Sequence, residues 1–424
     1  MLQPLPRDAG PGRPLASVPI PGSKSATNRA LFLAALAPGR SVLQGALDAE
    51  DTRWMRGALE ACGLPVQEVE GRLTVAGGTA PAPQHPLWLG ASGTTLRFLL
   101  PWLALRARGP VVLEGEPRLF ERPLAPLLDP LRSLGARFEL RPGRLAVDPA
   151  APPPGPVDLE VDAALSSQFL SGLAMTLAGL PAGGRLRWIS TSSVTYLTLT
   201  EGWLARFGVT ASRTDTSWTL PGGQLRGAEV RIPADWSGAA AFFAAAALTG
   251  RPITLGPWDP ADPQGDRAIL RILEAAGARV AERREGPETW VTLAGPLHRG
   301  LQADLEDCPD LGPVLAAVAA LAPGPSLLTG LHTLPLKECD RLEASAELVG
   351  WLGGSARIEG DHTLHIQPGG PPSPDRPPFD PRNDHRMAFA AAVGGLRWGG
   401  AVKDPHCVAK TFPAFWEAWE TCLR

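Results

Sequence analysis

Lysine is scarce in this chain. Of its 40 basic residues only four are lysines, and these are Lys24, Lys337, Lys403 and Lys410. Asparagine occurs only twice and tyrosine only once. Arginine therefore serves wherever a general surface cation suffices. A lysine that persists against this bias offers a compact ammonium that can gain and lose a proton, which arginine does not. The positions of the lysines are therefore informative.

Other absences exclude whole classes of protein. The five cysteines are odd in number and show no CxxC spacing, which predicts a reduced, cytoplasmic protein without a metal site. The longest apolar stretches, residues 239–248 and 311–322, are about half the ~20 residues that a membrane helix needs, and the N-terminus lacks a signal pattern. A net charge of −3 argues against nucleic acid as a partner. We expect a globular protein that acts on small molecules, as a monomer.

A repeated module organises the chain. An apolar-periodic helix, a glycine, a strand, a turn and a second strand recur at roughly 70-residue intervals. The copies lie at residues 59–77, 131–149, 204–222, 273–295 and 348–369, and their pivotal glycines are Gly63, Gly135, Gly208, Gly277 and Gly353. Glycine suits the end of a helix because that position often takes a left-handed conformation. A sixth helix, residues 411–424, ends the chain, and we expect its missing strand near residues 15–20.

Six similar modules predict two α/β halves of three modules each. The proline-rich stretches follow the second strand of a module, so we interpret them as loops rather than domain linkers. The chain is expected to cross between halves near Pro21 and again near Ile232 to Asp235. This gives a discontinuous domain of residues 1–20 and 235–424, closed by the C-terminal helix, with residues 21–234 inserted.

Several segments outside the module core share one architecture: small polar residues or glycine, then a helix start, with lysine or arginine nearby. They are residues 22–30, 89–99, 115–124, 164–173, 308–315, 336–344, 383–391 and 407–415. Exposed N–H groups and the positive end of the helix dipole favour an anion at such a place. One such segment alone carries little weight: an ordinary helix cap explains GASGTTLR better, and a surface ion pair explains DHRM better. Their number predicts a cleft for a small molecule with several negative charges.

Two carboxylates accompany these cations. Asp310 follows a proline at a helix start, where capping is the simpler role, and Glu338 lies between Lys337 and Arg341. A solvated charged turn explains the second segment equally well. The chain has neither a GxxxxGK[ST] phosphate loop nor a G-x-S-x-G nucleophile motif, so those chemistries are excluded.

Taken together, the segments GSKSATNRALFLAAL, SGTTLR, RLFERPL, SSQFLSGL, DWSGAAAFFAAAAL, PQGD, LKECDRL, NDHRMA and DPHCVAKTFPAF resemble the 5-enolpyruvylshikimate-3-phosphate (EPSP) synthases. The resemblance runs in order from about Pro21 to the last helix. It implies two inside-out α/β domains, each of three βαβαββ units, with the active site in the cleft between them. It also implies the family's reaction, in which shikimate 3-phosphate and phosphoenolpyruvate combine with loss of phosphate, without metal or organic cofactor. In the shikimate pathway this step leads to chorismate and the aromatic amino acids.

The resemblance also implies roles for residues of this chain. Those expected to bind shikimate 3-phosphate are Lys24, Ser25, Arg29, Ser166, Ser167, Gln168, Ser193, Tyr196, Asp310 and Lys337. Those expected to bind phosphoenolpyruvate are Lys24, Gly93, Arg122, Gln168, Arg341, Arg386 and Lys410. Lys24, Asp310 and Glu338 are the expected catalytic residues, with Asp310 as proton acceptor and Glu338 as proton donor, although residue type alone leaves open which carboxylate moves which proton.

Three positions depart from the family pattern. Ala91 and Thr333 stand where the family has asparagine, and Pro335 where it has arginine. These changes bear on substrate affinity more than on reaction type. The family's herbicide glyphosate competes with phosphoenolpyruvate, and Gly93 leaves room for it, so we expect sensitivity.

Two other functions compete with this one. The sister enolpyruvyl transferase that acts on UDP-N-acetylglucosamine shares the fold, but it carries a cysteine in a mobile loop, and residues 115–124 contain none. A non-catalytic anion-binding scaffold would have no need of Glu338 between two cations.

Overall fold

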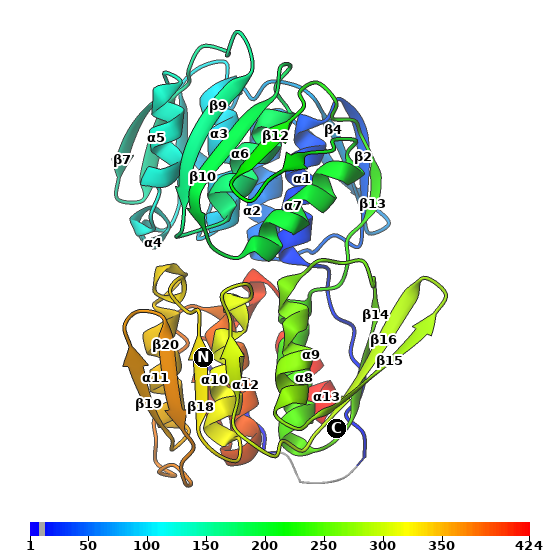
Figure 1. The fold of residues 1–424 in the computed structure, drawn as a ribbon, viewed down its shortest axis with the longest axis vertical. Helices are drawn as coiled ribbons and strands as arrows, with labels where there is room; N and C mark the ends of the chain where they lie inside the picture. Colours follow the sequence, from blue (N-terminus) through cyan, green and yellow to red (C-terminus); the bar gives the residue numbers. More distant parts are fainter. Residues whose placement is uncertain (8–12) are drawn as a thin grey trace. The chain divides into compact units, whose positions relative to one another are not determined.

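The computed structural model describes residues 1–7 and 13–424, which fold into two compact units. Unit 1 comprises Met1–Pro21 and Ala234–Arg424, and unit 2 comprises Gly22–Pro233 (Figure 1). Each unit has its own hydrophobic core. In both units, buried helices rather than a sheet form the centre of the core.

Unit 2 places three buried helices at its centre. These are α1 (Lys24–Leu36), α3 (Gly93–Arg106) and α6 (Gln168–Ala178), which contact one another pairwise. Nearly every residue of these helices is buried, including the polar residues of the first turns of α1 and α3. The remaining helices are α2 (Glu50–Ala61), α4 (Pro117–Glu121), α5 (Ala125–Ser133) and α7 (Val194–Arg206).

Three four-stranded sheets form the outside of unit 2 (Figure 1). Their strand orders are β13-β2-β4-β3, β5-β6-β8-β7 and β9-β10-β12-β11. The strands are β2 (Gly39–Gln44), β3 (Val66–Val69), β4 (Arg72–Gly77), β5 (Leu87–Trp88), β6 (Val111–Glu114), β7 (Arg137–Arg141), β8 (Arg144–Asp148), β9 (Val157–Ala163), β10 (Gly184–Thr191), β11 (Ser212–Arg213), β12 (Ser217–Leu220) and β13 (Glu229–Arg231). In each sheet a parallel pair continues into an antiparallel hairpin. This is the predicted βαβαββ unit, and β13 supplies the first strand of the sheet that contains β2.

Unit 1 repeats the plan around α8 (Trp236–Thr249), α10 (Gly312–Leu321) and α12 (His385–Trp398), which also contact one another pairwise. Alanine dominates the middle of α8 and α10, and such small side chains let helix backbones approach closely. Around them lie α9 (Ala268–Ala275), α11 (Arg341–Trp351), α13 (Phe415–Leu423) and the short 3₁₀ helices η1 (Gly265–Arg267), η2 (Pro309–Leu311), η3 (Leu334–Leu336) and η4 (Pro405–Lys410).

The sheets of unit 1 are less regular. One has the full order β17-β18-β20-β19, another has three strands in the order β14-β16-β15, and the last is the pair β1-β21. The strands are β1 (Leu2–Leu5), β14 (Ile253–Trp258), β15 (Arg279–Glu285), β16 (Glu288–Ala294), β17 (Gln302–Asp304), β18 (Ser326–Thr329), β19 (Ser355–Glu359), β20 (Thr363–Gln367) and β21 (Gly400–Lys403). Among the described residues, the complete βαβαββ unit therefore occurs once in unit 1.

The repeat read from the sequence is confirmed. All five pivotal glycines have a positive φ, between +86° and +118°, and each follows a helix and precedes an antiparallel hairpin. A side chain with a Cβ would strain the backbone there. The conserved shape of the module therefore depends on glycine at this point.

The expected N-terminal strand is displaced from its predicted place. Residues 15–20 form no strand; instead β1 pairs antiparallel with β21. The backbone N–H groups of Leu15 and Ala16 donate to the carbonyls of Pro252 and Cys422, so this segment crosses between elements rather than joining a ladder. Pro19 has no N–H to contribute to a sheet, which explains why the apolar residues misled the prediction.

Within residues 1–7 and 13–424, no helix combines the length and the apolarity needed to cross a membrane. All five cysteines lie in this described part of the chain, and all are free and buried.

Candidate active site

In unit 2 the predicted residues gather at the N-terminal ends of the three central helices. Lys24, Gly93 and Gln168 are the first residues of α1, α3 and α6. The first turns of these helices hold no acidic residue, so the positive ends of the three dipoles are not offset locally. We call the basic residues of this region the cationic cluster; its members are Lys24, Arg29, Arg97 and Arg122.

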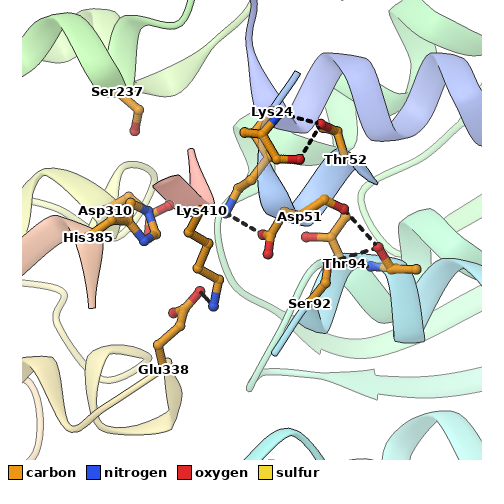
Figure 2. A network of polar contacts seen from close by, with 12 residues as sticks. Lys24, Asp51, Thr52, Ser92, Thr94, Ser237, Asp310, Glu338, His385 and Lys410 are labelled. Atoms are coloured by element: carbon orange, nitrogen blue, oxygen red, sulfur yellow. Dashed lines mark hydrogen bonds and ion pairs between the residues drawn. The ribbon is translucent and has the colours of Figure 1, made fainter. Parts of the chain in front are cut away.

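Lys24 has a protein partner that the sequence did not reveal. Its Nζ lies 3.1 Å from Oδ2 of Asp51, a buried residue in the first turn of α2 (Figure 2). The Thr95 hydroxyl donates to the backbone carbonyl of Asp51 at 3.4 Å, which ties this turn to the start of α3. Asp51 therefore holds the ammonium of Lys24 at the helix start, where the dipole alone would disfavour it.

Arg29 is fully enclosed among neutral groups. Its guanidinium donates to the hydroxyls of Thr200 (2.9 Å) and Ser171 (3.2 Å) and to the backbone carbonyl of Ser25 (3.0 Å). It also lies over the ring of Tyr196, 5.8 Å from the centroid. Burial lowers the pKa of Arg29 to about 10, because none of its three acceptors carries a charge. A buried cation without an anion is suited to receive one from a ligand.

Gly93 brings two guanidinium groups close to the start of α3. A Cβ at this position would lie 2.5 Å from Nη1 of Arg122 and 2.8 Å from Nη1 of Arg97. Arg97 also donates to Oε1 of Gln168 at 2.9 Å, and the Gln168 amide donates to the Thr94 hydroxyl at 3.1 Å. The start of α3 and the start of α6 are thus joined side chain to side chain.

The predicted serines flank this cluster. Ser166 accepts a hydrogen bond from the backbone N–H of Gln168 at 3.3 Å, and Ser167 is buried immediately before α6. Ser193 precedes α7 with a positive φ of 55°, a conformation that is uncommon for residues other than glycine. Its carbonyl accepts from the N–H of Tyr196, whose ring faces Arg29.

In unit 1 the predicted residues form one network of opposite charges, which we call the mixed cluster. Its members are Asp310, Lys337, Glu338, Arg341, Arg386 and Lys410. They come from η2, from the segment between η3 and α11, from the first residue of α11, from the start of α12 and from the end of η4. All six predicted residues of this unit are therefore brought together.

Arg341 is the centre of the mixed cluster. It donates to Glu338 (2.8 Å), to Asp310 (2.8 Å) and to Asp384, the N-cap of α12 (2.7 Å). Burial alone would lower its pKa, but the carboxylates of Asp384, Glu338 and Asp310 outweigh burial and raise the pKa above its ordinary value. The alternative of a solvated charged turn at residues 337–341 is wrong, because Arg341 is 1% exposed.

The two carboxylates of the cluster are each shared between cations. Asp310 contacts Lys337 (3.5 Å), Arg341 (2.8 Å) and Arg386 (3.2 Å). Glu338 contacts Lys410 at 3.3 Å (Figure 2). It also contacts Arg341 at 2.8 Å. An anion that entered this region would therefore compete with protein carboxylates for the same cations.

Arg386 contacts a hydroxyl group in addition to the carboxylate of Asp310. Its Nη1 donates to the Ser237 hydroxyl, which in turn donates to Oδ2 of Asp266 at 2.5 Å. Sequence reasoning singled out the segments of Ser237 and Asp266 for their resemblance but assigned these residues no role. Beyond that resemblance, their sequence signal is that both stand beside a helix start in the same half of the chain as Arg386.

Known proteins share this fold. An EPSP synthase structure from Acinetobacter baumannii matches with a TM-score of 0.76 at 25% identity, covering 99% of this chain and 98% of that one. The enolpyruvyl transferase NikO from Streptomyces tendae matches with a TM-score of 0.73 at 18% identity, covering 99% of this chain and 97% of that one, a likeness of fold alone. The fold is that of the enolpyruvyl transferases.

Sequence comparison narrows the class. The family model described as EPSP synthase (3-phosphoshikimate 1-carboxyvinyltransferase) matches residues 9–419. Proteins named 3-phosphoshikimate 1-carboxyvinyltransferase from Methanoculleus marisnigri and Syntrophobacter fumaroxidans are each 38% identical, over 95% and 96% of this chain and 96% of each relative. The chain therefore belongs to the EPSP synthase family of transferases, which confirms the resemblance seen in its motifs.

Proposed function

We propose that this protein transfers the enolpyruvyl group of phosphoenolpyruvate to the 5-hydroxyl of shikimate 3-phosphate and releases phosphate through a tetrahedral intermediate. The names of its relatives support this reaction. So does the distribution of charge: the cationic cluster offers a buried guanidinium with neutral partners, and the mixed cluster offers two carboxylates among four cations. This difference between the clusters is the observation that carries the proposal.

The cationic cluster is suited to the larger substrate. Arg29 needs an anion to offset its burial, and the phosphate of shikimate 3-phosphate would supply one. The hydroxyls of Ser166, Ser167 and Ser193, together with the side chain of Gln168, add donors around it. Lys24, held by Asp51, would reach both substrates.

The mixed cluster is suited to proton transfer. Arg341 and Lys410 both pair with the carboxylate of Glu338 while phosphoenolpyruvate is absent. When the substrate's carboxylate and phosphate engage these cations, Glu338 loses its partners and can take up a proton for delivery to the methylene carbon. Asp310, released from Arg386 in the same exchange, would accept the proton of the 5-hydroxyl. Each transfer contributes roughly 10²–10⁴-fold to the rate.

The fit to this reaction requires that both clusters act on one substrate pair. Bringing two polyanions together is unfavourable in water, and fixed cations both neutralise and align them, with alignment worth about 7–11 kcal/mol. We accordingly propose a single active site served by residues 21–234 and by residues 1–20 and 235–424. We propose further that the protein acts as a monomer in the cytoplasm.

The decisive experiment measures phosphate release from phosphoenolpyruvate with shikimate 3-phosphate as acceptor, and in parallel with UDP-N-acetylglucosamine. Release with shikimate 3-phosphate alone supports the proposal. Release only with the nucleotide sugar would assign the sister activity, and release with neither would leave a binding protein. Lys24→Met should abolish turnover, whereas Lys403→Met, the matched change at an exposed lysine outside both clusters, should leave turnover unchanged.

A further inference from the structure

Arg386 is held at both of its terminal nitrogens. Nη2 lies 3.2 Å from Oδ2 of Asp310, and Nη1 donates to the Ser237 hydroxyl. In the proposed function Asp310 must leave this contact in order to accept a proton from the substrate. In that function the attachment through Ser237 would remain.

The hydroxyl of Ser237 accepts a hydrogen bond from Arg386 and donates one to Asp266. A hydroxyl has one proton to donate and lone pairs to accept with. Ser237, the second residue of α8, donates its proton to Oδ2 of Asp266, so a lone pair faces Arg386. Asp266 thus polarises the hydroxyl toward the guanidinium and fixes which way it points.

Asp266 is itself buried at 5% exposure, in η1, and its second oxygen has no hydrogen-bond partner. A buried carboxylate oxygen without a donor is costly. A purely structural role would be served better by an amide or an apolar group. The Ser237 hydroxyl links this carboxylate to Arg386, whose positive charge favours the ionised form of Asp266.

We propose that Ser237 and Asp266 are positioning residues for Arg386, a buried relay that keeps its guanidinium aimed at phosphoenolpyruvate while Asp310 is engaged in proton transfer. The proposal rests on the function proposed above. Neither residue touches substrate; both act through Arg386. Phosphoenolpyruvate, rather than shikimate 3-phosphate, is the substrate whose binding depends on the relay.

The energetics separate this role from a structural one. Burial raises the pKa of Asp266 to about 6, with the Arg386 cation opposing the rise, so the charged carboxylate disfavours the folded state at neutral pH. Asp266→Asn keeps the shape and removes the charge. It should therefore melt at or above the wild-type temperature at pH 7, while weakening the use of phosphoenolpyruvate.

The test compares Asp266→Asn, Ser237→Ala and the double variant with the wild-type enzyme. We expect each single change to raise KM for phosphoenolpyruvate about tenfold, with KM for shikimate 3-phosphate unchanged. The double variant should be no worse than the worse single one, because both changes interrupt one relay. Asp262→Asn, a buried carboxylate that contacts Gln264 in the segment preceding η1, is the matched control and should leave both KM values unchanged.

Three results would overturn the proposal. One is an unchanged KM for phosphoenolpyruvate in Asp266→Asn. Another is a parallel rise in both KM values with a lower melting temperature, which would mark a structural role. Additive effects in the double variant would show two independent contributions. If the wild-type protein itself releases no phosphate from the two substrates, the proposed function fails and the relay fails with it.

Discussion

Replacing Arg29 by methionine should separate stability from substrate binding. The guanidinium is fully buried, and burial lowers its pKa from 12.5 to about 10. That difference corresponds to about 3 kcal/mol by which the charged form disfavours the folded state. The cost is present at every pH below about 10 and is relieved as the pH rises through that value, because the folded state then sheds the proton first.

Methionine removes the charge and fills similar space. The hydroxyls that Arg29 leaves behind still bond to each other, Ser171 to Thr200 at 2.9 Å, so few groups are left unsatisfied. The three hydrogen bonds lost with Arg29 offset most of this gain, so we expect Arg29→Met to leave the free energy of unfolding within about 1–2 kcal/mol of the wild-type value. Its affinity for shikimate 3-phosphate should fall at least about 30-fold, the effect of removing one partner of a buried charge pair.

The assay is thermal unfolding at pH 7 with and without shikimate 3-phosphate, together with KM for that substrate. Arg251→Met is the control, because this buried arginine donates to the backbone carbonyls of Arg13 and Leu423 in unit 1; its loss should not alter substrate affinity. A variant at Arg29 that melts several degrees earlier and binds shikimate 3-phosphate normally would refute the reasoning.

Three further outcomes are expected. Glu338→Gln should lower kcat by roughly 10²–10⁴-fold in the phosphate-release assay, with an unchanged circular dichroism spectrum; an active variant would remove Glu338 from proton transfer. Gly93→Ala should raise KM for phosphoenolpyruvate, since its Cβ displaces Arg122, and should weaken inhibition by glyphosate, which we expect to inhibit the wild-type enzyme at millimolar concentration. Burial raises the pKa of Cys62 and Cys422 to about 12, so the native protein should react slowly with thiol reagents, as a colorimetric titration would show.

Local signals in the sequence predicted much of the fold. A glycine after each periodic helix is explained by the left-handed turn that leads into a hairpin. All five glycines have the positive φ that this turn requires. The strand expected near residues 15–20 failed because apolar character alone does not supply a partner with free hydrogen-bonding groups. Pairing of β1 with β21 joins residues about 400 positions apart, which no local pattern encodes.

In the candidate site, too, local sequence signals identified some residues and long-range packing determined the others. Lysines and arginines at helix starts could be found from residue type and spacing, and the structure groups those of each unit. Their carboxylate partners were harder to find, because Asp51 lies outside every motif and Asp266, although it ends the segment PQGD, has no basic residue among the four of that segment. The ion pair that each carboxylate forms depends on how helices far apart in the sequence pack together, and local sequence does not encode that packing.

The points where the chain passes between the units have a consequence for its architecture. The N–H of Ser23 donates to the carbonyl of Pro233 at 2.8 Å within unit 2, and the N–H of Asp235 donates to the carbonyl of Pro21 at 2.9 Å within unit 1. Each unit is therefore closed where it is cut: the ends of the inserted segment meet, and so do the two broken ends of the host. Unit 2 is thus an insertion whose two ends lie together, and so do the two ends of unit 1 that flank it. A deletion of residues 22–233 that joins Pro21 directly to Ala234 would therefore need little rearrangement of unit 1.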